Sequence, residues 1–323
     1  MGSLLNYVIR RALFAIPVFL AVSILTFLIT NAAGNPAELV RLGIRSPTAA
    51  QLAQINAFFH VNEPVYIRYF YWISDFLHGN LGQSLYTGSV ASLIIPWIGT
   101  TLELQVPALL LALAIGIPIG IYSAKHQYSK GDYTITTAAI FGISMPTFWI
   151  GIMGIIVFSY YLRVLPAYGA YSAYPPYWWG SPLADRFAHI ILPLSVLTLV
   201  SIATITRLTR VNMLEVMRQD YILAGRASGL SEFKVTYKHA LKNAITPVVT
   251  IVGLTFGTFL AGAPALETTF SWPGLGFAFV TAASRLDLPT VQGIIMIITI
   301  MVLVANVATD LAFAFLDPRV RIT

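Results

Sequence analysis

Long apolar runs without a charged side chain recur along this chain, separated by more polar segments. Six such runs have at least 19 residues: residues 12–37, 106–124, 133–162, 187–206, 243–266 and 288–309. A helix of about 20 apolar residues crosses the hydrocarbon core of a bilayer, so each run predicts one membrane-spanning helix. Two further runs of low charge, 78–101 and 164–185, are rich in glycine, amide, proline or tryptophan residues and are typical of loops near the membrane surface.

The first apolar run follows Arg10 and Arg11, so a cleaved signal peptide is an alternative to a membrane span. Residues 12–29 are longer than the apolar core of a usual signal peptide, and residues 31–33 (Asn-Ala-Ala) form a weak cleavage site. We therefore expect an uncleaved first helix.

The composition also indicates a membrane protein. Of the 323 residues, 57% are hydrophobic and only 10% are charged, against about 25% charged in a typical soluble domain. If the N-terminus is cytoplasmic, 13 lysines and arginines fall on the inner side and 6 on the outer side. Positive charge is enriched on the cytoplasmic side of membrane proteins, so both termini are predicted inside. The net charge of +6 then reflects orientation in a bilayer rather than a nucleic-acid partner.

A long segment on the predicted outer side, residues 31–101, separates the first two spans. Ser46 and Pro47 predict the start of a helix that continues to about residue 59. A second helix is predicted over residues 65–78, with Gly79 as its stop. Its aromatic and apolar side chains form a stripe suited to the membrane surface or to a partner: Tyr66, Tyr69, Trp72, Ile73 and Phe76.

The predicted inner loop, residues 208–242, carries most of the cytoplasmic charge. Asp220 can cap a short helix over residues 221–228, and Gly229 can end it. A further helix is expected to begin after Ser231. A row of small residues allows the short helix to fit closely into a groove of another protein: Ala224, Gly225, Ala227 and Gly229. A basic loop beside anionic lipid is the alternative, although it does not explain that row.

Several kinds of chemistry are excluded by the residues themselves. No lysine is followed by Ser or Thr, as a phosphate-binding Walker A loop requires, and no pair of histidines has zinc-protease spacing. Without cysteine there is no thiolate nucleophile, and no nucleophile elbow of the hydrolase type occurs. Ion-coupled transport usually requires buried acids, whereas Glu103, Glu267 and Asp310 lie near the ends of predicted spans.

The inner loop resembles the coupling segment of the membrane subunits of ATP-binding-cassette (ABC) importers. Residues 225–232 and 239–247 are similar to the version found in the B-type permease family for dipeptides, oligopeptides and nickel, although Leu223-Ala224-Gly225 replaces the general Glu-Ala-Ala. The similarity continues at residues 7–11, 81–84, 146–149, 165–169, 267–276 and 317–319.

That resemblance implies an all-α membrane protein: a six-transmembrane-helix type I ABC importer (MetI-like) bundle with an extracytoplasmic insertion after helix 1. It implies residues 1–97 as an N-terminal helix with an extracytoplasmic loop, 98–316 as the permease domain with its coupling loop at 208–242, and 317–323 as a cytoplasmic tail. The implied partners are a second homologous permease, two cytoplasmic ATPases that bind ATP and Mg²⁺, and an extracytoplasmic solute-binding protein. This chain would then be neither an enzyme nor a holder of a cofactor or metal.

Two sets of residues follow as candidates for function. The coupling helix would contact an ATPase through Asp220, Tyr221, Ala224, Gly225, Arg226, Ala227 and Gly229. Small and hydroxyl residues within the spans are candidates for lining the solute path, with helix packing as the alternative: Gly142, Ser144, Thr147, Gly253, Thr255 and Gly257. Peptides are the expected solute, with oligosaccharides or nickel complexes as alternatives; an ion-coupled secondary transporter is a further alternative.

Overall fold

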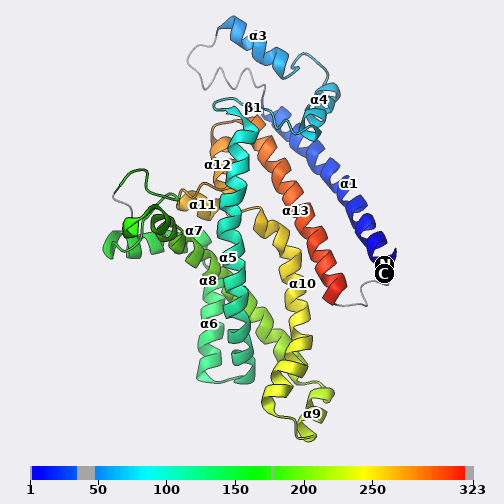
Figure 1. The fold of residues 1–323 in the computed structure, drawn as a ribbon, viewed down its shortest axis with the longest axis vertical. Coiled ribbons are helices and arrows are strands. Elements are labelled where there is room, and N and C mark those ends of the chain that lie inside the picture. Colours follow the sequence, from blue (N-terminus) through cyan, green and yellow to red (C-terminus); the bar gives the residue numbers. More distant parts are fainter. Residues whose placement is uncertain (1, 35–47, 176–177, 317–323) are drawn as a thin grey trace. The chain divides into compact units, whose positions relative to one another are not determined.

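The computed structural model describes residues 2–34, 48–175 and 178–316. Nearly all regular structure in these ranges is helical (Figure 1). A short hairpin is the exception, in which β1 (Gln83–Ser84) pairs antiparallel with β2 (Gly88–Ser89). The chain divides into two compact units, which we describe separately.

The first unit comprises Met1–Thr101, Leu260–Pro264 and Pro273–Thr323. Its helices are α1 (Gly2–Ala33), α3 (Ala49–Phe58), α4 (Val65–Leu77), the first part of α5 (Val90–Lys125), α12 (Leu275–Ser284) and α13 (Leu288–Leu316). Helices α1 and α13 lie side by side (Figure 1). A core at the start of α5 joins Val90 and Ile94 to Leu275 of α12 and Ile294 of α13, all fully buried.

The second unit comprises Leu102–Phe259 and Ala265–Trp272. After α5 it contains α6 (Lys130–Ser144), α7 (Thr147–Gly154), a π-helical segment Ile155–Tyr161, a 3-10 turn Trp178–Gly180 and α8 (Pro182–Met217). Then follow α9 (Asp220–Ala227), a second π-helical segment Lys234–Ala240, α10 (Leu241–Leu260) and α11 (Pro264–Thr269). Ala112, Ile205 and Val248 form a buried contact among α5, α8 and α10.

Among the described residues, five helices are long and apolar enough to cross a membrane: Ile9–Ala33, Val90–Lys125, Pro182–Met217, Lys234–Leu260 and Leu288–Leu311. A sixth span is present if the bent pair of α6 and α7 is counted as one. The six predicted runs all find a counterpart, and the chain is a multi-pass membrane protein. The span predicted over 133–162 is broken, because the helix Lys130–Ser144 and the helical segment Thr147–Tyr161 meet at 101°.

The bend between α6 and α7 has a local cause. Met145 adopts extended dihedrals (φ −85°, ψ 133°) and Pro146 follows it. A residue before proline is disfavoured in the helical region, and proline cannot donate a backbone hydrogen bond. The run 243–266 also contains a break before a proline, because α10 ends at Leu260 and a separate helix, α11, begins at Pro264.

The segment predicted on the outer side forms helices close to those expected. Thr48 caps α3 through a reciprocal pair of bonds with Gln51, whereas the predicted start at Ser46 and Pro47 lies outside the described residues. Helix α4 ends at Leu77, and Gly79 follows with φ +85°. The stripe of α4 was expected to meet the membrane surface or a partner. Only Tyr66 of its members is exposed, and the other four pack against the rest of the chain.

The inward packing of α4 is aromatic. The ring of Phe27 in α1 lies 5.6 Å from both Tyr69 and Trp72, and Phe19 lies 6.0 Å from Phe76. A hydrogen bond of 2.8 Å joins the hydroxyls of Ser23 and Tyr69. The stripe therefore stabilises α4 against α1 instead of presenting it to solvent.

Candidate functional site

Helix α9, between α8 and α10, carries the predicted coupling residues, and one side chain anchors it. Ile222 is 1% exposed and belongs to a cluster with Met213 of α8, Val235, and Ile121 of α5. Asp220 was expected to cap α9 but is its first helical residue. The cap position is held by Gln219, whose side chain makes no capping bond. The helix is thus fixed along one side and open along the other.

The open side holds most of the predicted residues. Asp220, Tyr221, Ala224, Ala227 and Gly229 are exposed, whereas Gly225 and Arg226 are half-buried. Exposure of small side chains on a helix of two turns leaves room for close approach by another protein.

The end of α9 is built by a glycine turn. Gly229 has φ +79°, in the left-handed region that glycine adopts without strain. Its amide bonds the carbonyl of Arg226 at 3.0 Å, and the amide of Leu230 bonds that of Gly225 at 3.2 Å. Nothing lies within 4 Å of the position that a Cβ at Gly229 would take, so nearby space does not restrict a larger residue there.

Side chains outside the predicted set complete this surface. The guanidinium of Arg226 pairs with Glu232 at 2.9 Å. The amide of Asn243 donates to the hydroxyl of Tyr221 at 2.8 Å. Phe233 and Tyr237 are exposed, with ring centroids 4.7 Å apart, and they add an aromatic pair that sequence reasoning missed.

A buried ion pair fixes α8 to the start of α6. Arg210 donates to both carboxylate oxygens of Asp132, at 2.6 and 2.7 Å. Asp132 is 2% exposed and also accepts bonds from the hydroxyl of Ser123 and the amide of Tyr128. From the sequence, Arg210 was expected to be one of the positive charges of the inner loop 208–242. In the structure it lies within α8, the helix that precedes α9.

Acids near the ends of spans are also held in pairs. Arg186 of α8 pairs with both carboxylate oxygens of Glu103, donates to the carbonyl of Ala170 at 3.0 Å, and lies 4.6 Å from the centre of the Trp272 ring. Arg11 pairs with Asp310 at 3.1 Å. These contacts give Glu103 and Asp310 structural roles.

The candidate path residues occupy different environments. A Cβ at Gly142 would meet Ala203 of α8 at 3.0 Å, so this glycine permits close packing of α6 on α8. Gly257 is buried, and Gly253 and Thr147 are half-buried. Ser144 and Thr255 are exposed, and the Thr255 hydroxyl bonds the Ile251 carbonyl of its own helix at 2.9 Å.

The exposed face of α10 carries several polar side chains for a membrane helix. Its exposed residues mix polar with apolar side chains, and Thr250 is half-exposed: Lys242, Asn243, Thr246, Thr255 and Thr258 beside Pro247, Ile251 and Leu254. A face of this composition is more typical of an aqueous path or a protein contact than of lipid.

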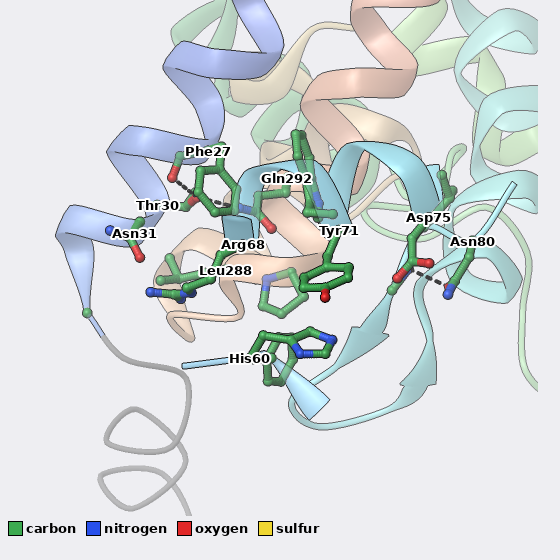
Figure 2. A pocket seen from close by; sticks show the side chains of 16 residues that line it. Phe27, Thr30, Asn31, His60, Arg68, Tyr71, Asp75, Asn80, Leu288 and Gln292 are labelled. Atoms are coloured by element: carbon green, nitrogen blue, oxygen red, sulfur yellow. Dashed lines mark hydrogen bonds between the residues drawn. The ribbon is translucent and has the colours of Figure 1, made fainter. Parts of the chain in front are cut away.

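A pocket lined by both polar and apolar side chains lies in the first unit, where α4 meets α1 and α13. Figure 2 shows Arg68, Tyr71 and Asp75 of α4 facing it beside His60 and Gln292. Tyr71 stacks on His60 with ring centroids 4.3 Å apart, and Gln292 donates to Thr30. The Nε atom of Arg68 is buried without a hydrogen-bond partner, and burial lowers the pKa of this guanidinium.

No group of three or more His, Cys, Asp or Glu side chains suited to a metal ion occurs in the described part of the chain. The candidate surfaces therefore consist of the α9 region, the exposed face of α10 and the pocket beside α4.

Known proteins resemble this chain over its whole length. It is 38% identical to the oligopeptide transport system permease protein AppB of Bacillus subtilis over 320 residues, covering 98% of this chain and 99% of that protein. It is 36% identical to the dipeptide transport system permease protein DppB of Escherichia coli over 336 residues, with the same coverage.

Family models match as well. Residues 116–322 match the model of binding-protein-dependent transport system inner membrane components, and residues 4–103 match the N-terminal model of such membrane components. The chain therefore belongs to the family of inner membrane components of binding-protein-dependent transport systems.

Proposed function

We propose that this chain is one of two permease subunits of an ABC importer that carries peptides. The observation that carries the proposal is similarity over nearly the whole chain to proteins named as dipeptide and oligopeptide permeases. In the proposed complex, two ATPases bind ATP and Mg²⁺ at the cytoplasmic side, and a solute-binding protein delivers the peptide from outside. This subunit contributes no catalytic residue, and both of its termini lie in the cytoplasm.

Helix α9 is proposed as the contact with an ATPase. In support, its open side exposes Ala224 and Ala227, and Ile222 anchors its other side to α5 and α8. Movement of the ATPase would then be transmitted from α9 to α8, the helix that precedes α9 in the chain. Helix α8 is in turn joined to α6 by the ion pair of Arg210 and Asp132.

The solute path is proposed to run between the two permeases. Supporting this, the exposed face of α10 carries threonines where a lipid-facing helix would be apolar. Ser144, Thr147, Gly253 and Thr255 remain candidates for the wall of this path, and Gly142 and Gly257 for the helix contacts behind it. We also propose a boundary between two sequence modules at residues 97 and 98. This boundary differs from the division by contacts, which groups residues 273–323 with the N-terminal unit.

The solute is tested on the cognate solute-binding protein. That protein is purified, denatured and extracted, and the released ligand is identified by mass spectrometry and metal analysis. We expect peptides, and addition of the same peptides should raise ATP hydrolysis by the reconstituted complex. An oligosaccharide or a nickel complex as the bound ligand would contradict the peptide assignment while leaving the importer class intact.

A further inference from the structure

Helix α4 has three distinct faces. Tyr69, Ile73 and Phe76 pack against α1 and α13. Arg68 and Asp75, its two charged residues, line the pocket that also contains His60 and Gln292 (Figure 2). The third face is apolar and exposed, with Tyr66, Phe70 and Leu77 at 66%, 66% and 69% exposure.

The charges are kept away from the exposed apolar face. At about 100° per residue, Leu77 and Asp75 point roughly 160° apart around the helix axis. A helix in contact with water on its exposed side would not need this separation, whereas a helix at a bilayer surface does. Aromatic side chains such as Tyr66 are also favoured at the membrane interface.

The helix lies alongside a membrane span. Its contacts with α1 extend from Phe27, which meets Tyr69 and Trp72, to Phe19, which meets Phe76. Phe19 and Phe27 are eight positions apart, which corresponds to about 12 Å along the axis of α1. Both phenylalanines lie well inside the candidate span Ile9–Ala33, so α4 runs beside apolar membrane-spanning surface.

An apolar groove continues that surface at the C-terminal end of α4. Its lining joins three helices and contains only apolar side chains, among them Phe19, Leu20, Ile73, Leu77, Ile300 and Val304. Leu20 and Val304 are themselves exposed parts of α1 and α13. The groove is therefore continuous with the outer surface of two candidate spans.

We propose that α4 is embedded in the outer leaflet of the bilayer, where Tyr66, Phe70 and Leu77 contact lipid and an acyl chain occupies the groove between α4, α1 and α13. The charged face with Arg68 and Asp75 then points away from lipid, toward the pocket beside His60 and Gln292. The outer segment is thereby a membrane-anchored part of the protein and not a freely projecting domain.

Site-directed spin labelling tests this directly, because the chain has no cysteine. Single variants Phe70→Cys, Leu77→Cys and Asp75→Cys are labelled in the assembled transporter in vesicles of phosphatidylethanolamine and phosphatidylglycerol. Collision rates are measured with oxygen, which concentrates in lipid, and with a water-soluble nickel chelate. Tyr66→Cys replaces either apolar-face variant that fails to assemble.

Oxygen collisions should dominate at Phe70 and Leu77, and more strongly at Leu77, whereas nickel collisions should dominate at Asp75. Nickel dominance on the apolar face would place that face in water and overturn the proposal. Exclusion of both reagents from the apolar face would also overturn it, because protein and not lipid would then cover α4.

Discussion

Gly229 supplies both a left-handed turn and an unoccupied space at the end of α9. We predict that Gly229→Leu abolishes the stimulation of ATP hydrolysis by loaded binding protein while the spans stay folded. A non-glycine residue at φ +79° is strained by about 1–2 kcal/mol, and a bulky side chain also obstructs the proposed ATPase contact. Stimulated hydrolysis and uptake are measured in reconstituted vesicles.

Two matched variants separate strain from bulk. Gly229→Asn adds bulk with a residue that tolerates the left-handed region, and Gly229→Ala adds strain with little bulk. If docking is the role, Asn impairs coupling more than Ala. Full activity of both Asn and Leu variants would contradict the contact with an ATPase.

Asp132 and Arg210 form a buried ion pair, and loss of this pair should lower the stability of the folded protein. Removing one partner of such a pair typically costs about 3–5 kcal/mol, because the other charge is left uncompensated. We predict that Asp132→Asn lowers the thermal aggregation temperature of the detergent-solubilised complex markedly.

The double variant Asp132→Asn with Arg210→Gln provides the control. If the two side chains stabilise each other, the double variant is less destabilised than the sum of the single variants. Additive losses would show that the pair contributes no mutual stabilisation.

The sequence allowed α9 to be predicted because its signals are local: a row of small residues, an acid in the first turn, and a glycine at its end. The pairing of Asp132 with Arg210 was not predictable in that way. Their positions are 78 residues apart, and only the packing of α6 on α8 brings them together. The burial of Ile222 likewise depends on residues from three other segments.

Helices α3 and α9 should lie on opposite sides of the membrane. We predict that Thr48→Cys at the cap of α3 reacts with an impermeant maleimide added outside intact cells, since residues 31–101 are proposed to be extracytoplasmic. The control Ser228→Cys at the end of α9 should react only after permeabilisation. The reverse pattern would contradict the charge-based orientation.

The spans were predictable because hydropathy and length identify membrane helices directly. The bend between α6 and α7 was not, since the apolar run continues through Pro146 without a change in polarity. Proline alone is also an insufficient signal: Pro17, Pro193 and Pro247 lie inside continuous helices. The orientation of the α4 stripe was missed because periodicity indicates a face but not what covers it.

For the complete molecule, we propose that transport requires a heteromeric complex and not this chain alone. In this proposal, the exposed face of α10 meets the second permease and the exposed residues of α9 meet an ATPase. The five or six candidate spans found in the described residues are too few to enclose a peptide-sized path without a second permease.

The direct test is uptake of labelled peptide into vesicles that contain either this subunit alone or the subunit with its second permease, both ATPases and the binding protein. We predict uptake only in the complete system. This uptake should require ATP on the side of the membrane where the ATPases lie, and it should be lost when either permease is omitted. Specific uptake by this subunit alone, insensitive to ATP, would contradict the proposed heteromeric importer and indicate a secondary transporter.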